Sequence, residues 1–145
     1  MTHEFVTSAV IQAAPAAVWS VLTDAAGYAS WNPEIVAIEG EFAVDSRITA
    51  HVRLGKGAVR RVSLRVTDFD PPISMEWTGG MPLGLFVGRR QLTVSPHAQG
   101  AEFRMVVTMT GPLAALMVKS TGDRQPEIDQ FSAALKARAE RPPSR

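Results

Sequence analysis

Apolar and polar residues alternate along most of the chain between Ile35 and Thr110, and this pattern restricts the possible folds more than any other feature. In residues 47–54, the even positions are apolar and the odd positions are polar or charged. A period of two places successive side chains on opposite faces of a β-strand. Because such runs follow one another with short turns, we expect an antiparallel sheet with one solvated and one apolar face. The apolar positions of the later runs are Val62, Leu64, Val66, Ile73, Met75, Trp77, Leu92, Val94, Phe103, Met105, Val107 and Met109.

The residues before this region predict one strand and two short helices. Phe5–Ile11 alternates and forms the first strand. Pro15 suits the first turn of a helix through Thr23, since its missing N–H is harmless there. Asp24 is placed to cap a second short helix that ends near Ser30.

The residues after this region predict one long C-terminal helix from about Leu113 to Ala139. Pro126 lacks the N–H that a helix interior requires and clashes with the carbonyl one turn earlier. We therefore expect a kink or short break between Gly122 and Pro126. The tight turn from the last strand into this helix falls at Gly111.

Length and composition restrict the class of protein further. The 145 residues suit a single domain, which we place at residues 1–140 with a flexible tail at 141–145. A net charge of +1 argues against a simple electrostatic binder of nucleic acid, and the lack of cysteine excludes disulfides and thiolate chemistry. No run is long and apolar enough to span a membrane, and the first residues lack a secretory pattern. We therefore expect a cytoplasmic protein.

The predicted elements define an α+β architecture in which one helix covers the apolar face of a sheet with about six to seven strands. A helix is a narrow rod, whereas a curved sheet of this width has more apolar area than one rod can cover. The remaining space is either filled by bulky side chains or forms a pocket.

Several motifs bear on the family of this chain, and they are spread over nearly its whole length. They are Val18-Trp19-Ser20-Val21-Leu22-Thr23-Asp24, Tyr28, Trp31-Asn32-Pro33, Trp77 followed by a glycine-rich loop, Gly111, and the ending Phe131 to Leu135-Lys136-Ala137-Arg138. In these motifs the sequence resembles the SRPBCC (START-like) superfamily, which includes polyketide cyclases, lipid-transfer domains and plant pathogenesis-related allergens. The resemblance implies a helix-grip fold that binds a hydrophobic or amphipathic small molecule. The sequence departs from the common pattern at Asp45-Ser46 and at Pro126.

A set of large, soft side chains has the inward parity expected for a ligand cavity. Methionine is flexible and polarizable, so it repacks around ligands of variable shape, but it also fills irregular gaps in ordinary cores. Both interpretations stay open. The candidate ligand-binding residues of this kind are Met75, Trp77, Phe103, Met105, Met109, Met117 and, on the short-helix segment, Trp31.

Arg90 is the most informative single residue, because the parity of Leu92 and Val94 points it toward the apolar face. A guanidinium is costly to bury without an anion. Arg90 should therefore meet a carboxylate, either from the protein or from an acidic ligand. The alternative is that a bulge at Gly88 lets Arg90 reach solvent at the end of the strand.

Two surface features allow contact with a partner. Four glycines between residues 79 and 88 frame the apolar residues Leu83, Leu85 and Phe86, which suits either a lid over a cavity or a packed loop. The basic residues Arg47, Arg53, Arg61 and Arg65 share outward parity, which predicts a basic stripe; we interpret it as a solvated face balanced by neighbouring acids.

The sequence contains no recognisable catalytic constellation, metal-ligand cluster or cofactor motif. The favoured function is binding, transport or sensing of a hydrophobic or amphipathic small molecule without catalysis. One alternative is an enzyme of the polyketide cyclase/dehydrase type. Another is a protein-interaction module of the chaperone-activator type, and the glycine-framed segment is also compatible with packing against a homodimer partner.

Overall fold

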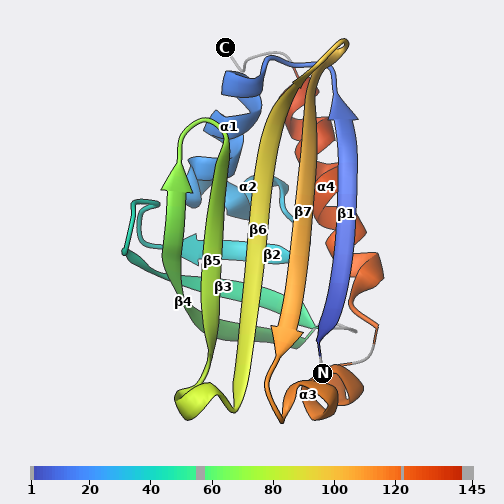
Figure 1. The fold of residues 1–145 in the computed structure, drawn as a ribbon. Coiled ribbons are helices and arrows are strands. Elements are labelled where there is room, and N and C mark those ends of the chain that lie inside the picture. The colour runs from blue at the N-terminus through green and yellow to red at the C-terminus, as the bar shows by residue number, and fades with distance from the viewer. Residues whose placement is uncertain (1, 55–57, 122, 142–145) are drawn as a thin grey trace.

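The computed structural model describes residues 2–54, 58–121 and 123–141. Within these ranges, seven strands form one antiparallel sheet in the order β1-β7-β6-β5-β4-β3-β2 (Figure 1). The alternation of the sequence matches the pairing, since inward-facing Trp77 lies between Val66 and Arg90 on the neighbouring strands. The strands are β1 (His3–Ile11), β2 (Ile35–Glu39), β3 (Arg47–Leu54), β4 (Ala58–Asp70), β5 (Ser74–Met81), β6 (Phe86–His97) and β7 (Gly100–Thr110).

Short helices connect β1 to β2, as the sequence predicted. The Asp24 carboxylate accepts the backbone N–H of Gly27 at 3.3 Å and thereby caps the second of them. The helices of this connection are α1 (Pro15–Thr23), the 3₁₀ turn η1 (Ala25–Gly27) and α2 (Tyr28–Trp31).

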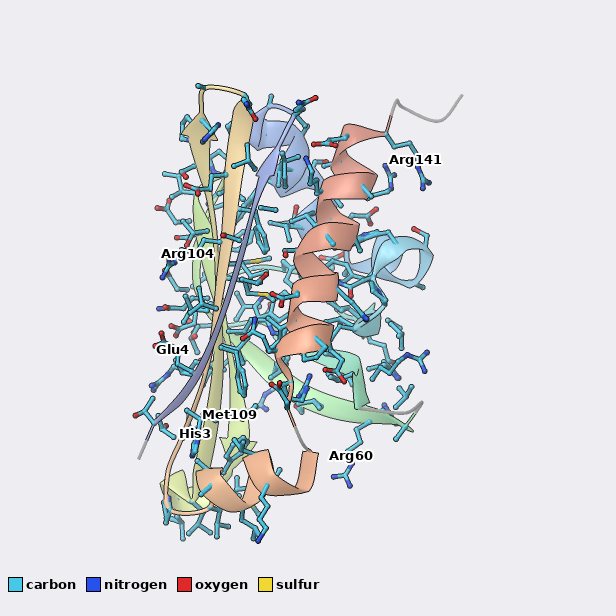
Figure 2. The ribbon with its side chains drawn as sticks, turned by 90° about the vertical axis from the view of Figure 1, so that its right-hand side faces the viewer. His3, Glu4, Arg60, Arg104, Met109 and Arg141 are labelled. Atoms are coloured by element: carbon cyan, nitrogen blue, oxygen red, sulfur yellow. The ribbon has the colours of Figure 1, made fainter. Side chains whose placement is uncertain are left out.

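The sheet is strongly bent, and β2 and β3 cross behind the long strands at a steep angle (Figure 1). Helix α4 (Gln125–Glu140) lies along one face of this bent sheet and packs mainly against β1 and α1 (Figure 2). A curved antiparallel sheet wrapped around a C-terminal helix is the helix-grip fold that the sequence indicated.

The C-terminal helical region is divided in two, at the position where the sequence predicted a break. Helix α3 (Ala114–Thr121) ends before the break, and α4 begins at Gln125 with Pro126 in its first turn, where proline is tolerated. The broken region includes Gly122, which lies outside the described residues, as do the predicted turn at residues 55–57 and residues 142–145 of the predicted tail. The predicted C-terminal helix is therefore two helices separated at the predicted break, and α3 lies beyond the end of α4 (Figure 2).

The glycine-framed segment differs from the predicted loop. Strand β5 continues through Gly79 and Gly80 to Met81, and only the 3₁₀ turn η2 (Pro82–Gly84) and the next residue separate β5 from β6. The hairpin is held against α3 because the Leu113 N–H donates to the Leu85 carbonyl at 2.9 Å. Gly111 makes this approach possible, since its φ is +102° and a Cβ there would lie 2.7 Å from the Gly84 and Leu85 oxygens.

Aromatic side chains fill one end of the concave face, next to α1 and α2. Tyr28 is fully buried and donates its hydroxyl hydrogen to the Leu22 carbonyl at 2.6 Å. The rings that pack around one another here are Tyr28, Trp31, Phe42, Trp77, Phe103 and Phe131. The cluster therefore occupies only part of the concave face.

Candidate ligand-binding cavity

A cavity of about 840 Å³ lies in the concave face next to the aromatic cluster, with which it shares Trp77. Small-molecule sites commonly occupy about 300–1,000 Å³, so the space suits an organic ligand of moderate size. Arg60 and Met81 are exposed members of the lining and mark an opening between β4 and the end of the β5–β6 hairpin. The lining comprises Val52, Ala58, Arg60, Arg61, Val62, Ser63, Leu64, Trp77, Gly79, Gly80, Met81, Phe86, Gly88, Arg89, Arg90, Val107, Met109, Met117 and Arg124.

The lining combines an apolar wall with charged groups of a single sign. Its uncharged members are apolar or small except for Ser63, and its charged members are all arginines. Arg61 and Arg89 have the outward parity of their strands and are exposed, so Arg90 and Arg124 are the guanidiniums that lie in the interior. No aspartate, glutamate or histidine is among the described residues that line the cavity. The cavity therefore presents apolar surface and cationic hydrogen-bond donors, but no carboxylate.

Four of the candidate ligand-binding residues line this cavity: Trp77, Arg90, Met109 and Met117. Trp77 and Met109 extend from the sheet, and Met117 extends from α3; Figure 2 shows Met109 at the end of the molecule that α3 occupies.

The remaining candidates lie elsewhere in the interior. Met75, Phe103 and Met105 are fully buried on the same face but are outside the lining. Trp31 packs edge-on against Phe131 and borders a separate, smaller hollow of about 210 Å³ beside α1.

Arg90 meets a carboxylate of the protein. Its Nη1 and Nη2 donate to Oε1 and Oε2 of Glu34, both at 2.7 Å, in a bidentate ion pair. A second guanidinium shares this carboxylate, because Arg124 Nη2 donates to Glu34 Oε2 at 2.8 Å. Trp77 and Phe131 flank Arg90, with ring centroids 5.8 and 5.6 Å from its Cζ.

Glu34 is the anion at the centre of this Arg90–Glu34–Arg124 triad, and the sequence did not identify it. Its side chain has no exposed surface, and Asn32 fixes its backbone by accepting the N–H groups of Glu34 and Ile35 at 2.9 and 2.8 Å. The only sequence signal is that Glu34 follows Trp31-Asn32-Pro33 and is the single acid at the start of an apolar run. The triad closes the inner end of the cavity, where Arg90 and Arg124 belong to the lining.

Burial and the Glu34 carboxylate shift the pKa values of the two guanidiniums in opposite directions. Desolvation lowers the pKa of Arg90, but the charge and hydrogen bonds of Glu34 outweigh it, so the pKa lies above its usual value. Desolvation dominates at Arg124 and lowers its pKa. Burial also raises the pKa of the Tyr28 hydroxyl, which keeps this group neutral.

The predicted basic stripe forms on the outer face of β3 and β4. Arg47 lies opposite Arg65, and His51 lies opposite Arg61. Neighbouring acids balance part of this charge: Glu39 Oε2 lies 2.8 Å from His51 Nε2 and 3.6 Å from Arg61, whereas Arg65 pairs with an aspartate on the β2–β3 connection at 3.3 Å. These partners agree with a solvated surface.

The described part of the chain lacks two further features, a metal-ligand cluster and a membrane-spanning helix. No group of three or more potential His, Cys, Asp or Glu ligands lies close enough together there to hold a metal ion. None of the helices described is both long and apolar enough to cross a membrane.

Fold and cavity together define a helix-grip domain of the kind that binds hydrophobic ligands. The model of the family described as polyketide cyclase / dehydrase and lipid transport matches residues 2–140. The chain belongs to this family, which confirms the START-like resemblance of its sequence.

Solved structures with the same fold show how widely it is used. Protein MLL2253 from Mesorhizobium loti has a TM-score of 0.71 and 18% identity, over 93% of this chain and 95% of that one. The Zhui aromatase/cyclase from Streptomyces sp. R1128 has a TM-score of 0.71 and 16% identity, over 97% and 94%. Ara h 8.0201 has a TM-score of 0.64 and 13% identity, over 96% and 98%. A search of curated proteins gave no significant match.

Proposed function

We propose that this protein binds a hydrophobic or amphipathic small molecule in the cavity, as a carrier or sensor. The observation that carries the proposal is the space of about 840 Å³ beside Trp77, Met109 and Met117. Burial of apolar ligand surface against such a wall yields about 25 cal/mol per Å². The family to which the chain belongs supports a ligand-binding role, since lipid transport is part of its description.

A cyclase-type enzyme is the second candidate, supported by the fold shared with the Zhui aromatase/cyclase. Guanidiniums at the inner end of the cavity could stabilise negative charge on an enolate oxygen. A cyclase also needs a group that removes a proton, and arginine is a poor base because it stays protonated. Ser63 is the one hydroxyl among the described lining residues, and nothing in the described lining would activate it. We therefore favour binding over catalysis.

Cavity occupation can be tested with Nile red, a neutral apolar dye that fluoresces when it leaves water. The variant Gly88→Leu should weaken dye binding, because position 88 lines the cavity and its added side chain would occupy part of the space. The backbone accepts the change, since a Cβ at Gly88 would meet its nearest neighbour, the Phe86 ring, at an ordinary 3.7 Å. Thr93→Leu is the matched control, because Thr93 lies on the exposed face of the same strand.

The proposal predicts equal dye binding by the wild type and by Thr93→Leu, and weaker binding by Gly88→Leu with unchanged circular dichroism. Equal binding by all three proteins would place the dye outside the cavity and contradict the proposal. As an independent measurement, native mass spectrometry of the purified protein would identify any small molecule that it retains.

Localisation and assembly are proposals that rest on the sequence. We propose that the protein is cytoplasmic and that it forms a homodimer. The exposed hairpin residues Met81, Leu83 and Leu85 are the apolar surface that a second copy or a partner protein would cover, and Leu83 is 97% exposed.

A further inference from the structure

The charge at the inner end of the cavity is not balanced by the groups in contact there. Glu34 carries one negative charge and is shared by two guanidiniums, so the triad has one net positive charge. Glu127 also acts on Arg124 electrostatically, and one of its carboxylate oxygens is buried without a hydrogen-bond partner, but it does not contact either guanidinium as an ion pair within the described residues. An excess charge in a desolvated site is costly unless an anion compensates it.

Arg124 is the guanidinium with unused hydrogen-bonding capacity. Both Nη atoms of Arg90 are occupied by Glu34, and Nη1 also lies 3.6 Å from the Met105 sulfur. Arg124, in contrast, has a buried Nε with no partner, although its side chain is only 8% exposed and lines the cavity. The indole Nε1 of Trp77, also in the lining, is a second buried donor without a partner.

Both of these unsatisfied groups are therefore donors, and they lie in a lining whose charged members are all arginines. Buried donors are normally paired, with the protein, with ordered water or with a bound group. A carboxylate accepts several such bonds, and those from a guanidinium are short and strong.

We propose that the ligand is an amphipathic organic anion whose carboxylate binds Arg124 while its apolar body lies along Trp77, Met109 and Met117. This assignment rests on the proposed function, because it specifies the ligand class of the same cavity. Arg90 has a positioning role, since its bidentate pair holds Glu34 in place and leaves Arg124 to meet the ligand.

The test compares decanoate with decanol, which share an apolar chain and differ in the charged group. Calorimetric titration at neutral pH should show tighter binding of decanoate by the wild type. Arg124→Gln should weaken decanoate binding roughly 10- to 100-fold, the range for a charged hydrogen bond, and leave decanol binding unchanged. Arg104→Gln is the matched control, because Arg104 is exposed on the outer face of the sheet (Figure 2).

Two more variants keep the test decisive if Arg124→Gln folds poorly. Arg124→Lys preserves the charge but not the Nε donor, so its affinity for decanoate should be intermediate. Glu34→Gln releases both guanidiniums and should strengthen decanoate binding, measured at a low temperature where the variant is folded. If Glu34 had only a structural role, its replacement would not increase the affinity for decanoate.

The outcomes separate the two proposals. If wild type binds both compounds equally, or if Arg124→Gln weakens both to the same extent, the carboxylate assignment is overturned while the cavity still functions as a binding site. If neither compound nor Nile red binds, the proposed function fails and the assignment fails with it.

Discussion

Replacement of Glu34 by glutamine is the sharpest test of the buried triad as a stabilising element. The substitution preserves the size of the side chain and removes its charge. Arg90 would then lose a bidentate ionic contact with both bonds at 2.7 Å, and Arg124 would lose one at 2.8 Å. Because all three side chains are nearly excluded from water, solvent cannot replace the lost carboxylate.

The expected cost follows from that burial. Side-chain exposure is 0% for Glu34, 12% for Arg90 and 8% for Arg124, so this pair of ion bridges belongs to the buried class. Removal of one partner from a buried ion pair costs about 3–5 kcal/mol. For a domain of this size, that loss lowers the melting temperature by roughly 10–15 °C.

Urea and thermal unfolding, followed by circular dichroism, would measure this loss. Glu102→Gln serves as the matched control, since Glu102 is exposed on β7 and its replacement should change stability by no more than about 0.5 kcal/mol. The triple variant Glu34→Leu/Arg90→Met/Arg124→Leu should recover most of the loss, because apolar replacement of a whole buried ionic group is often neutral. A cost for Glu34→Gln as small as that of the control would refute the reasoning.

Two other predictions concern the turn at Gly111 and the loss of stability at acidic pH. Gly111→Ala should destabilise the fold by about 1–3 kcal/mol, because its φ of +102° and the two carbonyl oxygens 2.7 Å from an added Cβ both oppose a side chain. In Gly88→Ala, where the Cβ meets only ordinary contacts, urea unfolding should show a much smaller change, and equal losses would contradict the argument. The backbone N–H of Gln12 and then the Lys136 ammonium lower the pKa of the Glu140 carboxyl from its ordinary value of 4.5. The ionised carboxylate therefore stabilises the fold fully above pH 4.5. This stabilisation is lost as the pH falls through the lowered pKa of the folded state. Urea midpoints measured against pH should therefore fall less steeply on acidification for Glu140→Gln than for the wild type, and identical profiles would show that the contact is absent in solution.

The strand alternation was enough to predict which side chains face the concave side of the sheet. Met75, Trp77, Phe103 and Met105 are all buried there, as their parity required. Parity does not reveal where along a strand the interior is filled. That depends on α1 and α2, which cover one end of the face, so Met75 lies in solid core while Trp77, two residues away, borders the cavity.

The partner of Arg90 could not be predicted for a related reason. Parity showed that Arg90 needed a carboxylate, but Glu34 is 56 residues away and Arg124 is 90 residues from Glu34. Glu34 also precedes the first residue of β2, so no strand pattern assigned it to a face. Only the bend that carries β2 and β3 across the long strands brings these three segments together.

The Arg90–Glu34–Arg124 triad has a consequence for how the molecule opens. It ties the approach to β2, the middle of β6 and the residue before α4 through one anion. If any one of these segments detached alone, it would leave a bare charge in a dry interior, which is less favourable than releasing all three together. Amide hydrogens at the start of β2 and in the first turns of α4 should therefore exchange with solvent as a single cooperative unit.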